Sequence, residues 1–367
     1  MAQSAPTPRP GILDIAAYVG GEAHAPGGGR QIRLASNEGA LGPSPRAVDA
    51  YAAVAAEIHR YPDGGSTRLR EALARHHGLD PSRIVVGAGS DEIIALIVRA
   101  YAGPGDEVVY SRHGFLMYPI AAKSVGAVPV TAPETDLTAD VDALLAAVTP
   151  RTRIVFLANP NNPTGTILPV DEVRRLHAGL PSDVVLVIDA AYAEYLTRND
   201  YSSGFELVEA ARNVVVTRTF SKIYALGGLR LGWCYASAEV TDVLNRIRGP
   251  FNVASAAQAA GLAALEDVAF VERSRVHNEA GRARFAEAVR AIGLRVHPSV
   301  TNFVLVSFAG QGAGRDDSEA ARQFLKARGI LVRQMTAYGL PDCLRVTIGT
   351  DAEMDEVVRA LADFLAA

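Results

Sequence analysis

The segment Val214-Val-Val-Thr-Arg-Thr-Phe-Ser-Lys-Ile-Tyr-Ala-Leu-Gly-Gly-Leu-Arg230 joins a β-branched run to a turn that is rich in polar residues. The run predicts a strand that is buried on both faces, because it is short, apolar and followed by turn residues. The turn brings together two hydroxyls, Lys222, a Gly-Gly pair and Arg230. In open α/β sheets, ligands bind beyond the carboxyl ends of such strands. The segment therefore predicts both a fold class and a place for a site.

The same pattern recurs through the middle of the chain. Further strand-like runs are Ile84–Val86, Glu107–Tyr110, Ala127–Val130, Ile154–Leu157 and Val184–Ile188. Helical patterns such as Ser90–Tyr101 and Val170–Ala178 lie between several of them. This alternation predicts an α/β fold with a mostly parallel sheet flanked by helices.

After Gly249-Pro250 the pattern changes to a long Ala-rich helical region over residues 253–291. Strands are expected near Asn302–Ser307, Ile330–Arg333 and Leu344–Ile348, and a final amphipathic helix over Ala352–Ala366. We expect a smaller α+β domain that the N-terminal segment completes. The predicted division is an arm and part of the small domain in 1–50, a large domain in 51–250, and an interdomain helix with the small domain in 251–367.

Composition bounds the class of protein. A chain of 367 residues with 49% hydrophobic and 21% charged residues is typical of a soluble globular protein with more than one core. The net charge of −4 gives no reason to expect nucleic acid or an anionic membrane as a partner. The two cysteines form no metal-binding pattern, and no signal peptide or membrane span is evident. These features favour a cytoplasmic location and predict no metal site.

Lysine occurs only at Lys123, Lys222 and Lys326, so the other 33 of the 36 basic residues are arginine. A coding bias toward arginine explains the imbalance. Chemistry that needs a lysine amine nevertheless has only three candidates, and Lys222 alone lies in an apolar, hydroxyl-bearing turn after a strand. There its pKa is expected to fall enough to favour imine chemistry.

Three other strand ends carry polar residues. In Arg83-Ile-Val-Val-Gly-Ala-Gly-Ser-Asp-Glu92, a glycine turn leads into a helix for which Ser90 is the expected N-cap, and free N–H groups there suit a phosphate. The turn Asn159–Gly165 contains more Asn, Pro and other turn-forming residues than a simple connection between two elements needs. Asp189 ends an apolar run, where a carboxylate is costly to bury without a cationic partner, although a helix N-cap would also explain it.

Together these segments supply what a pyridoxal phosphate site requires. A carboxylate pairs with the pyridine nitrogen so that the ring acts as an electron sink. Several donors and a cation hold the phosphate. One lysine forms an imine and then moves a proton.

The residues also resemble the fold-type I pyridoxal-phosphate-dependent aminotransferases, and most closely the histidinol-phosphate aminotransferase group. The matching stretches are Leu34–Glu38, Leu41–Pro45, Arg60–Asp63, Asn159–Gly165, Thr219–Arg230 and Leu344–Thr350. The resemblance covers nearly the whole chain. It implies a large domain with a mostly parallel seven-stranded sheet flanked by helices, and a small α+β domain.

The resemblance assigns roles at the cofactor. Lys222 matches the Schiff-base lysine, which also acts as general acid and base. Asp189 matches the partner of the pyridine nitrogen, and Asn162 and Tyr192 match the partners of the ring oxygen. Phe115 matches the aromatic residue that stacks on the ring, although ordinary core packing is a serious rival for a single Phe. The residues expected to seat the phosphate are Ser90, Asp91, Thr219 or Ser221, and Arg230.

On the substrate side, Arg345 matches the arginine that clamps a carboxylate, a task that suits a planar guanidinium. Tyr18, Asn37 and Arg333 match further substrate-side positions, and Arg333 is equally compatible with a surface position. Tyr61 matches a tyrosine that reaches the phosphate of the neighbouring subunit's cofactor, which implies a homodimer with shared sites.

The chain departs from the family pattern at Ser36-Asn-Glu-Gly-Ala40, which lacks the usual second Asn and Pro, and at Ala190, where many members carry Glu. The expected reaction is reversible transamination between histidinol phosphate and 2-oxoglutarate, in histidine biosynthesis. The alternatives on the same scaffold are an aromatic amino-acid aminotransferase and a threonine-phosphate decarboxylase. A nucleotide-binding or dehydrogenase domain is disfavoured, because the glycines near Gly87 lack the GxGxxG spacing.

Overall fold

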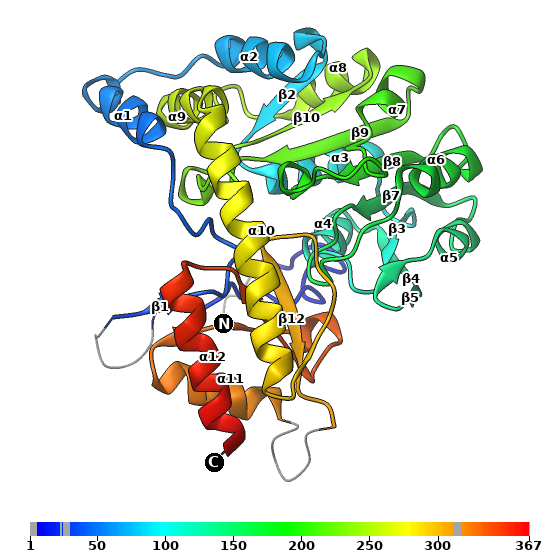
Figure 1. Cartoon of the computed structure of the whole chain (residues 1–367). Coiled ribbons are helices and arrows are strands. Elements are labelled where there is room, and N and C mark those ends of the chain that lie inside the picture. The colour runs from blue at the N-terminus through cyan, green and yellow to red at the C-terminus, as the bar shows by residue number, and fades with distance from the viewer. Residues whose placement is uncertain (1–5, 23, 25–29, 311–316, 367) are drawn as a thin grey trace, which may run out of the picture.

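The computed structural model describes residues 6–22, 24, 30–310 and 317–366. Its largest element is a seven-stranded sheet with the order β2-β10-β9-β8-β7-β3-β4 (Figure 1). The strands are β2 (Ile84–Gly87), β3 (Glu107–Ser111), β4 (Val128–Ala132), β7 (Thr152–Ala158), β8 (Val185–Asp189), β9 (Val214–Thr219) and β10 (Gly232–Ala236). Two short strands, β5 (Glu134–Thr135) and β6 (Thr138–Ala139), form a separate ladder.

The predicted α/β class with a mostly parallel sheet is confirmed. All pairings among β9, β8, β7, β3 and β4 are parallel, whereas β10 runs antiparallel to both β2 and β9. The six expected runs all form strands. The seventh strand, β10, was not predicted, because Gly-Trp-Cys-Tyr-Ala contains no β-branched residue.

Helices cover both faces of this sheet. Alternate residues of β8 enter opposite cores: Leu186 and Ile188 pack on one side, and Val185 and Val187 on the other. The helices whose residues join the first core are α1 (Pro45–Ala53), α2 (Thr67–His77), α5 (Val141–Ala146), α6 (Val170–Gly179), α7 (Phe205–Ala210) and α9 (Ser255–Glu266). Those of the second core are α3 (Ser90–Tyr101), α4 (Met117–Ser124) and α8 (Ala238–Ile247).

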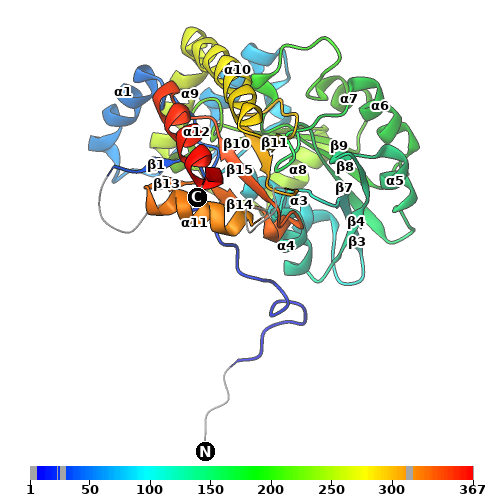
Figure 2. The ribbon, with the colours of Figure 1, turned by 60° about the horizontal axis from the view of Figure 1, so that its bottom comes forward.

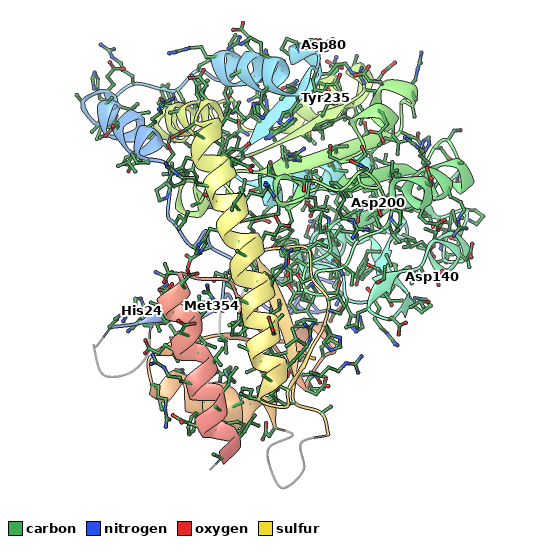
Figure 3. The ribbon with its side chains drawn as sticks, in the orientation of Figure 1. His24, Asp80, Asp140, Asp200, Tyr235 and Met354 are labelled. Atoms are coloured by element: carbon green, nitrogen blue, oxygen red, sulfur yellow. The ribbon has the colours of Figure 1, made fainter. Side chains whose placement is uncertain are left out.

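Side chains also secure the ends of the sheet. Tyr235 of β10 reaches the turn before β2, where its hydroxyl accepts a hydrogen bond of 3.4 Å from the backbone N of Asp80 (Figure 3). Helix α1 (Pro45–Ala53) packs against α9. A rigid frame therefore supports the first turn of α3, where backbone N–H groups are free, and the carboxyl ends of β7, β8 and β9.

A second sheet has the order β11-β12-β15-β14, from β11 (Arg295–Val296), β12 (Phe303–Ser307), β15 (Cys343–Thr347) and β14 (Arg333–Gln334). Helices α10 (Val268–Ala291), α11 (Ser318–Ala327) and α12 (Asp351–Ala366) lie against it (Figure 2). Strand β1 (Ile32–Arg33) pairs in parallel with β13 (Ile330–Leu331), so the N-terminal segment joins this part of the molecule. The domain boundaries at residues 50 and 250 stay a prediction.

The helical region expected over residues 253–291 is confirmed, and it consists of two helices. Asp267 separates α9 from α10 and caps α10 by accepting a hydrogen bond from Phe270 N. Two local expectations were wrong. Ser90 is the first residue of α3, and the cap position belongs to Gly89 at φ 86°. The run Ile330–Arg333 is divided between β13 and β14, which lie in different sheets.

No helix in the described part of the chain is long and apolar enough to cross a membrane.

The two cores should respond separately to a cavity. Phe285 is buried in the core of the second sheet, whereas Trp233, the one tryptophan of the chain, is buried in the core of the large sheet. We expect Phe285→Ala to cost about 3–5 kcal/mol of stability in its own core. In denaturant, part of the far-UV circular dichroism should then be lost before the tryptophan emission changes. Leu186→Ala, in the large core, should move the emission transition instead. Coincident transitions in both variants would contradict a division into two units.

Candidate active site

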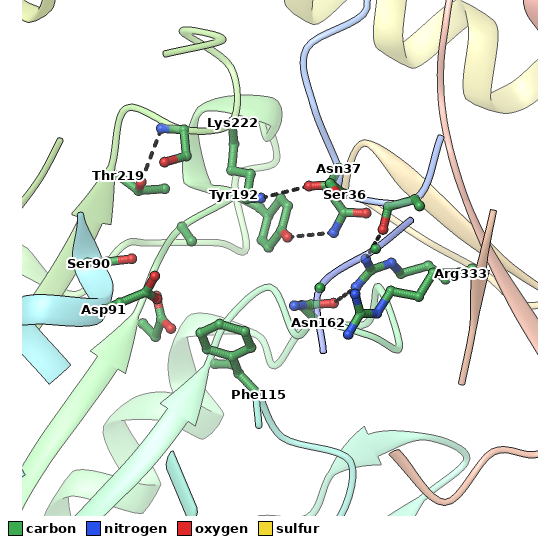
Figure 4. Close-up of a pocket in the computed structure, with 18 of the residues that line it drawn as sticks. Ser36, Asn37, Ser90, Asp91, Phe115, Asn162, Tyr192, Thr219, Lys222 and Arg333 are labelled. Atoms are coloured by element: carbon green, nitrogen blue, oxygen red, sulfur yellow. Dashed lines mark hydrogen bonds between the residues drawn. The ribbon is translucent and has the colours of Figure 1, made fainter. Parts of the chain in front are cut away.

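A cavity of about 250 Å³ lies beyond the carboxyl ends of β7, β8 and β9, between the large sheet and the second sheet (Figure 4). Every residue predicted for the site lines it except Tyr61. In Figure 4, Ser90, Asp91 and Thr219 lie at one end and Asn162 and Arg333 at the other, with Lys222 and Tyr192 between them. The structure thus brings the predicted residues together, while their individual roles stay predictions.

Lys222 follows β9 in the turn of the opening segment, and its amine points into the cavity (Figure 4). Its Nζ donates a hydrogen bond of 3.3 Å to the carbonyl of Ser36 and lies 5.9 Å from the centre of the Tyr192 ring. Burial lowers the pKa of Lys222 to about 8, and the positive charges of Arg345 and Arg230 add to that effect. Roughly a tenth of this amine is therefore neutral at pH 7, against less than about 0.1% of an ordinary lysine.

Asp189 is the last residue of β8, and only 6% of it is exposed. One carboxylate oxygen accepts a hydrogen bond of 2.7 Å from the Tyr118 hydroxyl, and the other accepts one of 3.1 Å from Thr217. Burial raises the pKa of Asp189, although both hydrogen bonds oppose the shift. Among the described residues, no basic side chain forms an ion pair with it. The carboxylate is held in place but lacks a counter-charge.

The other end of the cavity has the chemistry of an anion seat. The first residues of α3, Ser90 and Asp91, present their N–H groups at a helix N-terminus. Arg230 donates to Asp91 Oδ2 at 3.0 Å and to Ser221 Oγ at 3.4 Å. A Cβ on Gly89 would lie 2.3 Å from the Arg230 guanidinium. Only a residue without a side chain lets Arg230 approach the helix so closely.

The opposite wall carries a second cation, Arg345, of which 4% is exposed. Its guanidinium donates to Asn162 Oδ1 and, at 3.0 Å, to the carbonyl of Ala35, while its buried Nε has no partner. Asn37 donates a hydrogen bond of 2.8 Å to the Tyr192 hydroxyl. That hydroxyl therefore keeps its own proton to donate to another acceptor.

The N-terminal segment forms one side of the cavity, through Tyr18, Gly20 and Gly21. Arg333 lies 5.5 Å from the centre of the Tyr18 ring and donates a hydrogen bond of 2.8 Å to the Val19 carbonyl. Arg333 is therefore tied to the site rather than free at the surface. Phe115 lies across the cavity from Lys222 (Figure 4).

The structure places Tyr61 and most of the Asn159–Gly165 turn outside the cavity. Tyr61 lies outside the cavity, is 82% exposed, and stacks on Phe251 with ring centres 4.6 Å apart. Within the Asn/Pro turn, only Pro160 and Asn162 line the cavity. Asn159 instead makes two hydrogen bonds to the backbone of Leu168, which shape the turn.

The sequence patterns did not identify three residues that hold the side chains of the site in place. Ser36, Tyr118 and Thr217 contact Lys222 or Asp189, but none was assigned a role. The contact of Thr217 follows from the pairing of parallel strands, since Thr217 is the partner of Asp189 in the register of β8 and β9. The contact of Tyr118 does not follow from such a pairing, because it depends on how α4 packs on the sheet.

These residues suit a group that carries a protonated ring nitrogen and a phosphate. The buried carboxylate without a counter-charge would gain one from the nitrogen. The helix N-terminus and Arg230 would bind the phosphate, and the partly neutral amine of Lys222 is suited to imine formation.

Comparisons with known proteins agree with this chemistry. Residues 29–361 match the family described as aminotransferase class I and II. The chain is 67% identical to the histidinol-phosphate aminotransferase of Rhodospirillum centenum, over 99% of each chain. It is 62% identical to that of Paramagnetospirillum magneticum, over 99% of this chain and 100% of the relative. A crystal structure of histidinol-phosphate aminotransferase from Sinorhizobium meliloti in complex with pyridoxal-5'-phosphate superposes with a TM-score of 0.89 and 31% identity, over 100% of this chain and 99% of that one.

The burial of the Asp189 carboxylate is expected to lower the folding stability of the ligand-free protein, although the site needs this charge. The pKa of Asp189 is raised by folding, so the native state binds more protons than the unfolded chain above the ordinary aspartate pKa of 3.8. Stability is therefore lost as pH rises through the interval between that value and the raised one. Asp189→Asn should make the ligand-free protein more stable at pH 7, by about 0.5–2 kcal/mol, and less so at pH 4. Urea unfolding at both values measures this, and a less stable variant at pH 7 would contradict it.

The lowered pKa of Lys222 predicts an unusual reactivity profile. Competitive acetylation of the ligand-free protein, read by peptide mass spectrometry, should show the Lys222 reaction rising through a pH of about 8. Lys123 and Lys326 serve as internal references in the same digest. The shape of the profile is decisive, since burial slows the reagent at every pH. A Lys222 profile with its midpoint near that of an ordinary lysine would refute the electrostatic account.

Proposed function

This chain belongs to the class I and II aminotransferases, and we propose that it transfers the amino group of histidinol phosphate to 2-oxoglutarate, giving imidazole-acetol phosphate and L-glutamate, with pyridoxal 5'-phosphate as its cofactor. The reaction is reversible and belongs to histidine biosynthesis. The observation that carries the proposal is the meeting of Lys222, Asp189 and Arg345 in one cavity. The 67% identity to a histidinol-phosphate aminotransferase supports the choice of substrate.

The cofactor would be held along the length of the cavity. Asp189 would bind the pyridine nitrogen, Tyr192 and Asn162 the ring oxygen, and Phe115 one face of the ring. The residues that would seat the phosphate are Ser90, Asp91, Thr219, Ser221 and Arg230. When bound, the cofactor supplies an electron sink for the carbon next to the amino group of the substrate.

Lys222 would bind the cofactor covalently and then act as the proton carrier. As a free amine, Nζ would take the proton from the carbon next to the amino group of the substrate. The environment that lowers the pKa of Lys222 to about 8 keeps part of the amine neutral at physiological pH, as a base must be. The carbonyl of Ser36, 3.3 Å away, gives Nζ a fixed hydrogen-bond acceptor.

The substrates present different anions to the same site. Glutamate and 2-oxoglutarate carry a carboxylate next to the reacting carbon, and the buried Arg345 would clamp it as a fork. Histidinol phosphate carries a phosphate instead, which would lie among Arg345, Arg333 and Tyr18.

We also propose a homodimer and a cytoplasmic location. Tyr61 is exposed, as are Phe251, on which it stacks, and Tyr51 and Ile58, which precede it closely in the chain. A second copy would cover these side chains, and Tyr61 would then reach the phosphate of the neighbouring cofactor. The two-domain division would place the shared sites between the large and small domains.

Steady-state kinetics test the proposal. We expect kcat/KM to be much higher for histidinol phosphate with 2-oxoglutarate than for phenylalanine, and no decarboxylation of threonine phosphate. Lys222→Ala should lower kcat by at least about 10³-fold, since it removes both the nucleophile and the proton carrier. Lys123→Ala is the matched control, because Lys123 lies on the surface and donates to the Asp14 carbonyl. A higher kcat/KM for phenylalanine would overturn the choice of substrate.

A further inference from the structure

Tyr118 occupies an unusual position behind the site. It lies on α4, is fully buried, and does not line the cavity. Its ring stacks on Phe156 with centres 4.3 Å apart and planes 5° from parallel. Its edge meets Phe115 at 5.9 Å and 89°. One side chain therefore contacts Phe115, which lines the cavity, and, through its hydroxyl, Asp189.

The hydroxyl makes the shorter of the two hydrogen bonds to Asp189, at 2.7 Å against 3.1 Å from Thr217. The two bonds end on different carboxylate oxygens, so together they fix the plane of the carboxylate. Burial and the nearby Asp189 raise the pKa of Tyr118 well above its ordinary value. The hydroxyl therefore keeps its proton and acts as the donor.

A donor to an ionised carboxylate stabilises the charged form over the neutral one. This matters at Asp189, because burial acts in the opposite direction and no ion pair from the residues that the structure describes offsets it. Loss of the Tyr118 hydroxyl would leave Asp189 with only Thr217 and the backbone of Ala191 as donors in a buried setting. The carboxylate would then take up a proton more readily and turn more freely.

We propose that Tyr118 is a positioning residue of the reaction: its hydroxyl keeps Asp189 ionised and correctly turned, and its ring supports Phe115. The inference rests on the proposed function, because it concerns the ring of the cofactor. Core packing alone is the competing explanation. Removal of the Tyr118 hydroxyl distinguishes the two explanations, since phenylalanine would keep the packing and lose the hydrogen bond.

The test compares Tyr118→Phe with Tyr110→Phe. Tyr110 is also buried and its ring lies 6.1 Å from that of Tyr118, but no hydrogen bond joins it to Asp189 and it does not line the cavity. The readouts are the Kd for pyridoxal phosphate, the pH midpoint of the visible absorbance of the holoenzyme, and kcat and KM separately.

We expect Tyr118→Phe to weaken cofactor binding by about 10-fold or more, the usual effect of losing one hydrogen bond to a charged group. The absorbance midpoint should move to higher pH, because a less ionised Asp189 leaves less positive charge on the ring. The value of kcat should fall by about 10-fold or more, with KM changed by less than about 3-fold. Tyr110→Phe should match the wild type in all three readouts.

Coupling gives a second measurement. In an Asp189→Asn background, Tyr118→Phe should weaken cofactor binding no further, because the charge it serves is absent. An equal loss in both backgrounds would assign Tyr118 to packing. Equality of Tyr118→Phe with Tyr110→Phe would overturn the proposal, as would loss of the native circular dichroism in Tyr118→Phe. If the wild type binds no pyridoxal phosphate, the proposed function itself fails, which is a distinct result.

Discussion

The carboxylate of Asp189 lies at the end of a strand that helices cover on both sides, and its burial constrains the structure around it. Only 6% of Asp189 is exposed, so water solvates it poorly there, and the fold provides Tyr118 from α4 and Thr217 from β9 as donors. These donors fix the carboxylate but do not neutralise it. The site is therefore incomplete without a cation, and a protonated pyridine nitrogen has the right charge.

The parallel sheet explains why the remaining groups meet at this point. Adjacent parallel strands end at one edge, so Asp189 and Lys222 follow neighbouring strands into the same cavity. The second sheet contributes the opposite wall through Arg345 on β15. Positive charges at both ends of the cavity, from Arg230 and Arg345, also lower the pKa of the Lys222 amine between them. The two arginines that suit anion binding are therefore the same residues that help to lower the pKa of Lys222.

The sequence predicted most of the large sheet and the position of Lys222, and the reasons are local. β-Branched runs mark six strands, and Lys222 is one of only three lysines. Strand β10 was missed because it contains no β-branched run, although its Trp and Tyr favour a strand. Asp267 was missed because one capping aspartate divides a continuous helical pattern. Tyr118 and the contact of Arg345 with Asn162 depend on tertiary packing, and the role of Tyr61 depends on a second subunit.

Reductive trapping tests the central claim most directly. Borohydride treatment of the protein loaded with pyridoxal phosphate converts an imine into a stable amine, which peptide mass spectrometry locates. With three lysines at Lys123, Lys222 and Lys326, the outcome is unambiguous. The account predicts stoichiometric modification of the peptide that contains Lys222. Modification of Lys123 or Lys326 in its place, or no stable adduct, would contradict it.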